Sequence, residues 1–282
     1  VKNLNANLII ANTLAEVIQN SNILFYCVGT PSMSDGKANL NILLEAIREN
    51  LDLIKKIPSD KPKTIVIKST VPPSSTKDII KPFIESIGFS VGKDIYLANN
   101  PEFLREGFAW ADFIEPDRIV IGAADSDTGK TVSDIYQPFH SPVFLVSLNT
   151  AEYIKYLSNA LLADMISFAN EMSMVAETIG DIDIPESFKI LHLDKRWRGN
   201  PAKMTSYLYP GCGYGGYCLP KDLQAIHSLS KEKGYPANLL GEISSVNQRI
   251  KSNLVAKILK NSSSENLIGI LGLSFKPGSD DV

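Results

Sequence analysis

The chain of 282 residues carries 28 Lys and Arg against 31 Asp and Glu, a net charge of −3, and 44% of its residues are hydrophobic. This content supplies a full core, and the balanced charge without a basic arm disfavours nucleic acid as a partner. The longest apolar run, Ile23 to Val28, is far too short to span a bilayer. Three cysteines, an odd number, favour a reducing compartment. Composition therefore predicts a soluble, cytoplasmic protein without membrane contact.

The N-terminal half alternates short apolar runs with amphipathic segments. Helical spacing links Leu40 to Ile54 and Ile79 to Ile87. Strand–helix alternation predicts an α/β fold with a mostly parallel sheet covered by helices, and the first strand is expected to be buried on both faces. The predicted strands are residues 23–28, 64–68, 95–98, 118–122 and 143–146.

The apolar period lengthens after Thr150. Steps of three and four connect Ile154 to Ile179 and end at Gly180, which is typical of a helix C-terminus. The pattern predicts one helix of about 30 residues and about 45 Å, suited to a spine between domains or to a dimer interface. Further predicted elements are helices at 185–193, 220–233 and 236–260, a linker at 261–266, and a strand at 267–271 that opens another domain.

Three polar loops follow the first three predicted strands, at 29–31, 69–73 and 99–102. Each on its own is compatible with an ordinary turn, because Pro, Asn and Ser favour turns for backbone reasons. Ligands of open parallel sheets bind beyond the carboxyl ends of the strands. The three loops share that edge, so together they indicate a binding site.

A glycine-rich loop, residues 211–222, is the strongest chemical signal. Pro220 is typical of the first turn of a helix, which places Cys218 near the helix start, where the helix dipole and Lys221 would stabilise a thiolate. One alternative is a small structural thiol in a turn, which is also the interpretation of Cys27. Another is a zinc site formed by Cys212, Cys218 and His227, although this spacing fits no familiar zinc pattern, so no metal is predicted.

Lys155 and Asn159 lie four positions apart and therefore share one face of the long predicted helix. A solvated polar face is the ordinary explanation of such a pair. If this face turns toward the strand loops instead, Lys155 can stabilise an oxyanion.

Seven segments in chain order resemble the UDP-glucose/GDP-mannose 6-dehydrogenases along nearly the whole chain. They are residues 28–31, 68–73, 100–107, 117–122, the helix around Lys155 and Asn159, residues 213–222 and residues 272–277. The resemblance implies an NAD-dependent enzyme that oxidises the C6 hydroxyl of a nucleotide sugar twice, with UDP-glucose as the expected substrate and UDP-glucuronate as the product. GDP-mannose is the alternative substrate, and a non-catalytic nucleotide-sugar-binding homologue is the alternative class.

The resemblance also implies roles for individual residues. Cys218 attacks the intermediate aldehyde, and the thiohemiacetal is oxidised to a thioester that water hydrolyses. Lys155, Asn159 and Asp222 polarise the C6 oxygen and its water, while Glu102, with Thr70, is the general base. The implied NAD contacts are Thr30, Thr70, Glu106 and Lys221. The implied substrate contacts are Phe103, Leu104, Arg105, Lys155, Asn159, Arg196, Tyr207, Tyr214, Gly215 and Lys276.

The resemblance further implies the domain plan. Residues 1–148 are expected to form a truncated Rossmann-like NAD-binding domain that lacks its first strand and glycine loop. Residues 149–260 are expected to form a central helical domain that carries the cysteine loop and mediates a homodimer. Residues 261–282 are expected to begin a second Rossmann-like domain that binds the nucleotide.

Overall fold

The computed structural model describes residues 8–57, 61–194, 197, 207, 210–232, 234, 236–262 and 267–272. Contacts divide the chain into two compact units, one formed by Val1–Pro31 and Ala38–Lys155, the other by Ser32–Lys37 and Tyr156–Val282. They are called unit 1 and unit 2 below. The long helix α6, Leu148–Ile179, begins in unit 1 and ends in unit 2.

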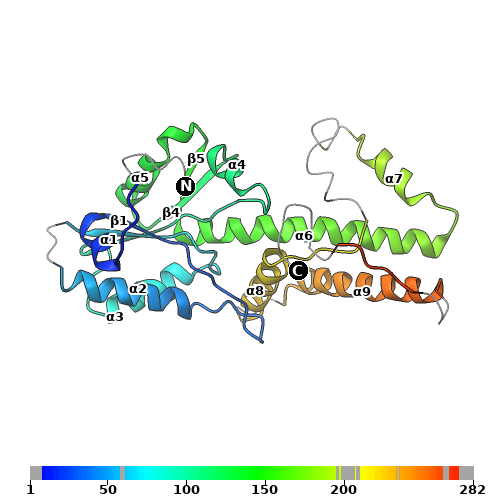
Figure 1. Cartoon of the computed structure of the whole chain (residues 1–282), viewed down its shortest axis with the longest axis horizontal. Coiled ribbons are helices and arrows are strands. Elements are labelled where there is room, and N and C mark those ends of the chain that lie inside the picture. The colour runs from blue at the N-terminus through cyan, green and yellow to red at the C-terminus, as the bar shows by residue number, and fades with distance from the viewer. Residues whose placement is uncertain are drawn as a thin grey trace. The chain divides into compact units, whose positions relative to one another are not determined.

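Unit 1 is built on a five-stranded sheet in the order β1-β2-β3-β4-β5 (Figure 1). Strands β1 to β3 are parallel, β4 pairs with β5 in parallel, and β3 and β4 meet antiparallel through two residue pairs. The predicted α/β fold with a mostly parallel sheet is confirmed. The strands are β1 Ile23–Tyr26, β2 Lys63–Ile67, β3 Ile95–Asn99, β4 Ile119–Ala123 and β5 Val143–Val146.

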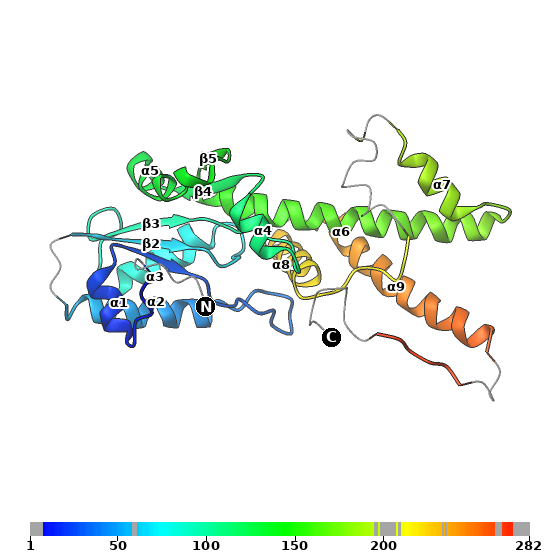
Figure 2. The same ribbon diagram turned by 45° about the horizontal axis from the view of Figure 1, so that its top comes forward.

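Helices cover both faces of this sheet (Figure 2). On one face lie α1 Leu14–Asn20, α2 Asn41–Ile54, the π-helix η1 Thr76–Ile80 and α3 Lys81–Ser86, whose apolar residues pack on β1, β2 and β3. On the other face Val132 of α5, Ser126–Ile135, packs on Val66 and Ile121. Unit 1 also contains α4 Ala109–Ile114 and the 3-10 turn η2 Gln137–Phe139.

Strand β1 corrects one expectation. Its residues alternate, with Leu24 and Tyr26 buried but Phe25 exposed, so the strand is not buried on both faces. Cys27, which follows it, is exposed rather than buried. Among the strands that the structure describes, β1 lies at the edge of the sheet, and the face that carries Phe25 is less covered there than the corresponding face of β2.

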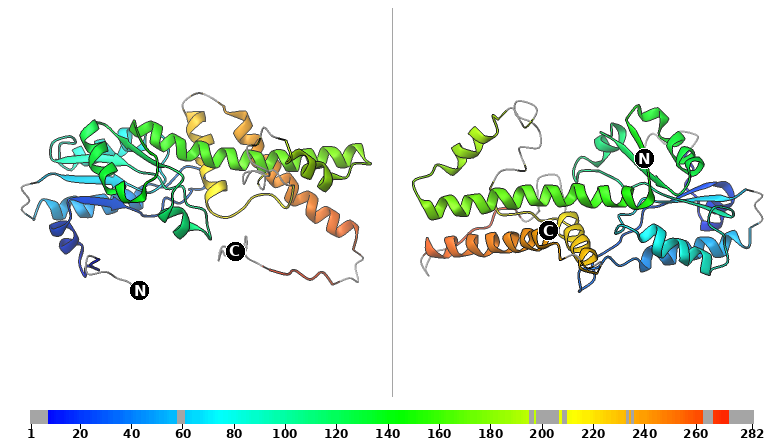
Figure 3. Two further views of the ribbon diagram at one scale, coloured as in Figure 1. Left: turned by 90° about the horizontal axis from the view of Figure 1, so that it is seen from above. Right: turned by 180° about the vertical axis from the view of Figure 1, so that it is seen from behind.

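Unit 2 contains most of α6 and the helices α7 Ile184–Leu191, α8 Cys218–Glu232 and α9 Asn238–Lys260. Helix α9 runs beside α6 (Figure 3, right), where Ser167 Oγ donates to the Ile243 carbonyl at 3.4 Å. Gly180 adopts a left-handed φ of 81° directly after α6, which confirms the predicted helix end. None of the helices in the described ranges is long and apolar enough to cross a membrane.

Among the described residues, the apolar side chains of α6 are exposed in part, and Met165 is buried. Leu157, Leu161 and Phe168 each leave about half of the side chain accessible, whereas Lys155 and Asn159 are buried. The core of unit 2 forms from Ala163, Tyr214, Leu223 and Ile243. The explanation of Lys155 and Asn159 as a solvated face is therefore wrong.

The strand expected at 267–271 does not form. Residues 267–272 carry no regular secondary structure, and Leu267 and Leu271 are fully exposed. A strand is stabilised by pairing with a neighbour, and this segment has no strand partner within the described residues.

Candidate active site

The carboxyl edge of β1, β2 and β3 gathers the predicted polar loops of unit 1. Thr30 is buried and its Oγ1 donates to the Thr70 carbonyl at 2.7 Å. Ser69 Oγ donates to the Val28 carbonyl at 2.7 Å. Because β1 and β2 are parallel, the loops that follow them end side by side and are cross-linked through these hydroxyl groups.

Lys155 joins this edge from the start of α6. Its Nζ lies 2.9 Å from Glu102 Oε1 and 5.7 Å from the ring centroid of Phe103. The Lys155 side chain is almost fully buried, while the Glu102 side chain keeps 27% of its surface exposed. The predicted base and the predicted oxyanion-stabilising amine thus form one charge pair in unit 1.

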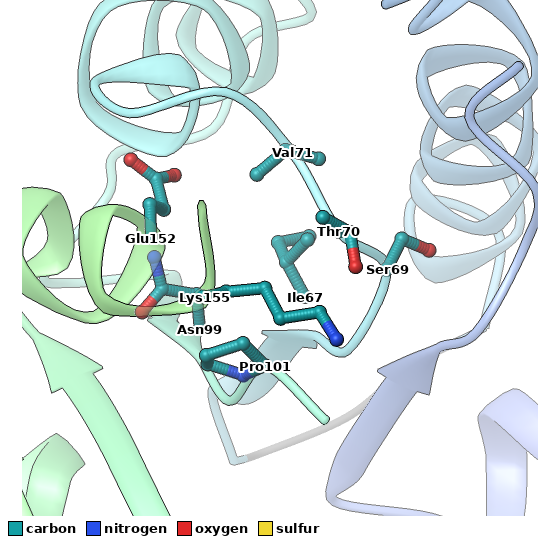
Figure 4. A pocket seen from close by; sticks show the side chains of 8 residues that line it. All are labelled: Ile67, Ser69, Thr70, Val71, Asn99, Pro101, Glu152 and Lys155. Atoms are coloured by element: carbon teal, nitrogen blue, oxygen red, sulfur yellow. The ribbon is translucent and has the colours of Figure 1, made fainter. Parts of the chain in front are cut away.

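A small pocket lies beside this pair (Figure 4). In this view Lys155 extends across the pocket with its amine below Thr70, and the Glu152 carboxylate points away on the other side. The pocket is lined by Ile67, Ser69, Thr70, Val71, Asn99, Pro101, Glu152 and Lys155.

Lys68 is a half-buried neighbour of the Lys155–Glu102 pair, and no role was assigned to it from the sequence. Its Nζ donates to Asn100 Oδ1 at 3.0 Å, and Tyr136 donates its hydroxyl to the same oxygen. Burial lowers the pKa of Lys68 to about 8, an effect that Glu102 opposes. The sequence could have identified Lys68 by its position directly after a buried strand, because a lysine there needs a polar partner at the edge of the sheet.

Glu152 is a second buried group that was missed. It lies one turn before Lys155, and its two oxygens accept the backbone N–H groups of Ser74 at 2.7 Å and Thr76 at 2.8 Å. Burial raises the pKa of Glu152 to about 7, although these hydrogen bonds lower it. The carboxylate fastens the chain that follows Thr70 to the start of α6.

In unit 2, Cys218 is exposed and is the first residue of α8. A helix start is a position at which the helix dipole stabilises a thiolate. Lys221 Nζ pairs with Asp222 Oδ1 at 2.7 Å, and Asn159 donates its amide to Asp222 Oδ2. Lys221, Asp222 and Asn159 are all buried, so they form a buried polar cluster, and Lys221 and Asp222 belong to the helix that Cys218 begins.

The remaining predicted ligand contacts have varied surroundings. Phe103 is half-buried under the Arg118 guanidinium, 4.2 Å from its ring centroid, and Arg105 pairs with Asp112 at 2.6 Å. Tyr214 is buried in the core of unit 2. Leu104 and Glu106 are exposed, Tyr207 and Gly215 are half-buried, and Arg196 and Lys276 lie outside the described residues.

The metal alternative finds no supporting geometry. In the part of the chain that the structure describes, no three His, Cys, Asp or Glu side chains are grouped as a metal ion would require. This includes Cys212, Cys218 and His227.

Comparisons with known proteins match both units. Residues 1–140 match the NAD binding domain of the UDP-glucose/GDP-mannose dehydrogenase family, and residues 149–249 match its central domain. The UDP-glucose 6-dehydrogenase of Rickettsia conorii is 40% identical over 269 residues, covering 94% of this chain and 58% of the relative. The UDP-glucose 6-dehydrogenase YwqF of Bacillus subtilis is 38% identical, covering 93% of this chain and 57% of the relative.

Solved structures of two dehydrogenases are also similar to this chain. A UDP-glucose dehydrogenase from Pyrobaculum islandicum matches with a TM-score of 0.83 and 35% identity, over 96% of this chain and 61% of that chain. A GDP-mannose dehydrogenase from Pseudomonas aeruginosa matches with a TM-score of 0.61 and 32% identity, over 96% of this chain and 60% of that chain. The chain thus spans about three fifths of the length of the relatives that it matches.

Proposed function

Because the chain belongs to the UDP-glucose/GDP-mannose dehydrogenase family, we propose that its protein oxidises UDP-glucose to UDP-glucuronate with NAD. The observation that carries the proposal is an exposed cysteine at the start of the helix that also carries the buried Lys221 and Asp222, with Asn159 bound to Asp222. Binding alone requires no nucleophile, so the retained thiol favours an enzyme over a non-catalytic homologue.

The proposed reaction at the sugar C6 has four steps, namely an oxidation, the addition of a thiolate, a second oxidation and a hydrolysis. The C6 alcohol loses a hydride and a proton to become an aldehyde, to which the Cys218 thiolate adds to give a thiohemiacetal. The oxyanion formed in this addition takes up a proton to complete the thiohemiacetal. Loss of a second hydride from C6, together with the hydroxyl proton, then leaves a thioester on Cys218. Water, deprotonated by Glu102, attacks the thioester carbonyl and releases the carboxylate and the thiolate. Lys155 stabilises negative charge on the C6 oxygen, while Asn159 and Asp222 orient it.

NAD, when bound, accepts one hydride in each oxidation. The space beside Gly29 is open and the buried Thr30 hydroxyl lies in the same turn, which supports a cofactor at this edge of unit 1. Thr30, Thr70, Glu106 and Lys221 would hold it.

Sugar contacts are proposed to come from residues of both family domains. They are Phe103, Leu104, Arg105, Arg196, Tyr207, Tyr214, Gly215 and Lys276. The domain limits 1–148, 149–260 and 261–282 stay part of the proposal.

We further propose a cytoplasmic homodimer. The exposed Leu157, Leu161 and Phe168 on α6 support a partner surface, since a row of large apolar side chains is costly to leave in water. Sedimentation of the complete protein tests it, and a monomer at micromolar concentration would contradict it.

The test of the activity is the number of NADH molecules formed per sugar nucleotide by the complete protein as the cell makes it. We expect two with UDP-glucose and a much lower rate with GDP-mannose. A preference for GDP-mannose would reassign the substrate, and one NADH per sugar would remove the second oxidation.

Cys218→Ser tests the nucleophile. We expect this variant to halt after the first oxidation, since the alcohol of serine is a far weaker nucleophile than a thiolate. Cys212→Ser, which changes the neighbouring exposed thiol, is the matched control. Unchanged steady-state turnover in Cys218→Ser would exclude Cys218 from the mechanism.

A further inference from the structure

We propose that Asn247, on α9, is a positioning residue that fixes the main chain leading to Cys218. The catalytic part of this inference rests on the proposed function, and its structural part does not. Asn247 does not belong to the groups assigned to the reaction above.

The Asn247 amide binds both main-chain groups of one loop residue. Its Oδ1 accepts the Tyr214 N–H at 2.9 Å, and its Nδ2 donates to the Tyr214 carbonyl at 2.9 Å. The Asn247 side chain is buried, with 6% of the residue accessible. A buried loop must satisfy its peptide groups, and here one amide replaces the neighbouring strand that would do so in a sheet.

Gly213 fits closely against the same amide. A Cβ at this position would lie 2.3 Å from Asn247 Oδ1 and 3.1 Å from Ile250 Cγ2, and Gly213 has a φ of 96°. The loop therefore approaches α9 more closely than any residue with a side chain allows. Because of this close contact, the position of the Asn247 amide and the conformation of the loop depend on each other.

The held residue stands close to the nucleophile along the chain. Gly215, Gly216 and Tyr217 separate Tyr214 from Cys218, and Gly216 also has a positive φ, 71°. Glycines leave a chain many conformations, so a thiol after them is poorly placed unless the chain is fixed nearby.

A second asparagine holds the other end of the loop. Asn170, on α6, accepts the Gly211 N–H through its Oδ1 at 2.7 Å. The Tyr214 ring adds a third anchor, because it packs in the cluster of Ala163, Leu223 and Ile243. Unlike Asn170 and the Tyr214 ring, the Asn247 side chain binds both a donor and an acceptor of the main chain. Its hold on the loop therefore requires one oxygen that accepts and one nitrogen that donates.

That dependence provides the test. Asn247→Ala removes both hydrogen bonds. Asn247→Asp keeps the acceptor for Tyr214 N–H but sets an anionic oxygen against the Tyr214 carbonyl, and protonation of that carboxyl at lower pH restores a donor. Gln248→Ala, an exposed neighbour on α9, is the matched control.

The structural readout is hydrogen exchange of the Tyr214 amide and the rate at which iodoacetamide alkylates Cys218, with Cys27 as internal reference. We expect Asn247→Ala to speed exchange at least tenfold and to change the Cys218 rate relative to Cys27. Gln248→Ala should change neither. If Asn247→Ala changes neither the exchange of the Tyr214 amide nor the alkylation of Cys218, Asn247 does not fix this loop. That result would hold whether or not the protein carries out the proposed oxidation.

The functional readout is turnover of the complete protein. We expect Asn247→Ala to lower kcat by about 10- to 100-fold with the KM for NAD within a factor of two. The activity of Asn247→Asp relative to the parent should recover as the pH is lowered, whereas that of Asn247→Ala should stay constant. A relative activity of Asn247→Asp that does not depend on pH would overturn the positioning role.

Discussion

The two units each contain a buried lysine paired with a carboxylate, and the pairs differ in access to water. Lys155 and Glu102 lie 2.9 Å apart in unit 1, and 27% of the Glu102 side chain is exposed. Lys221 and Asp222 lie 2.7 Å apart in unit 2, and 2% of the Asp222 side chain is exposed. A carboxylate that meets water can exchange protons with it, whereas a sealed one can only orient its neighbours. Similar ion pairs thus suit different tasks.

The largest expected effect is on turnover, in the pair of unit 1. Lys155→Ala should lower kcat by about 10³-fold and change KM much less, because the charge is needed mainly as negative charge develops on oxygen. Steady-state kinetics of the complete protein measure it. Lys189→Ala, in an exposed surface pair with Glu186, is the control. An effect confined to KM would make Lys155 a binding residue.

The pair of unit 2 should matter more for stability. Asp222→Asn leaves the buried Lys221 charge without a carboxylate, and breaking a buried pair in this way costs about 3–5 kcal/mol. Glu102→Gln should cost less, since water reaches that pair. Urea unfolding measures the loss of unfolding free energy in both variants. Equal losses would show that the two ion pairs contribute equally to stability.

Glu152 adds a pH dependence confined to unit 1. Its ordinary pKa of 4.5 is raised to about 7 in the folded chain by burial, so the folded state holds this proton more tightly than the unfolded chain does. Its stabilising contribution is present below pH 4.5 and is lost as the pH rises to 7, by roughly 3 kcal/mol. Glu152→Gln should lack this slope in its own pH profile of unfolding free energy, so the difference between parent and variant should change with pH by roughly 3 kcal/mol. An unchanged slope would show that Glu152 titrates normally.

The smallest effect concerns the glycine loop of unit 2. Gly213→Ala should destabilise by about 1–3 kcal/mol, because it forces a positive φ on alanine and a contact with Asn247. Gly211→Ala is a matched control, since its Cβ would meet nothing within 4 Å. Thermal unfolding measures both, and equal shifts would mean that the close approach at Gly213 costs nothing.

Sequence patterns predicted the features of the fold that depend on residues close together in the chain. The five strands lie where apolar runs placed them, within one or two residues, and α6 ends at Gly180 as expected. The cysteine turn was also placed correctly, because Pro220 marks a helix start through its own backbone geometry. These features depend on neighbours in the chain.

What was missed depends on partners far along the chain. Glu152 reaches Ser74, Asn247 reaches Tyr214, and Lys68 reaches Asn100, across more than 30 positions in each case. Amphipathic spacing placed the apolar side chains of α6 but not the burial of Lys155 and Asn159, because the pattern records where apolar side chains lie and not what covers each face. The short helices α1, α4 and α5 were missed, since about two to three turns give too little periodicity.

The exposed thiols make the protein suited to spectroscopy. Cys27 is accessible in unit 1 and Cys212 in unit 2, and Cys218 is the third cysteine of the chain. In a Cys218→Ser background, nitroxide labels on Cys27 and Cys212 place one probe on each unit without engineering a new attachment point. Pulsed dipolar spectroscopy would then record how the distribution of distances between the probes responds to cofactor and to sugar nucleotide.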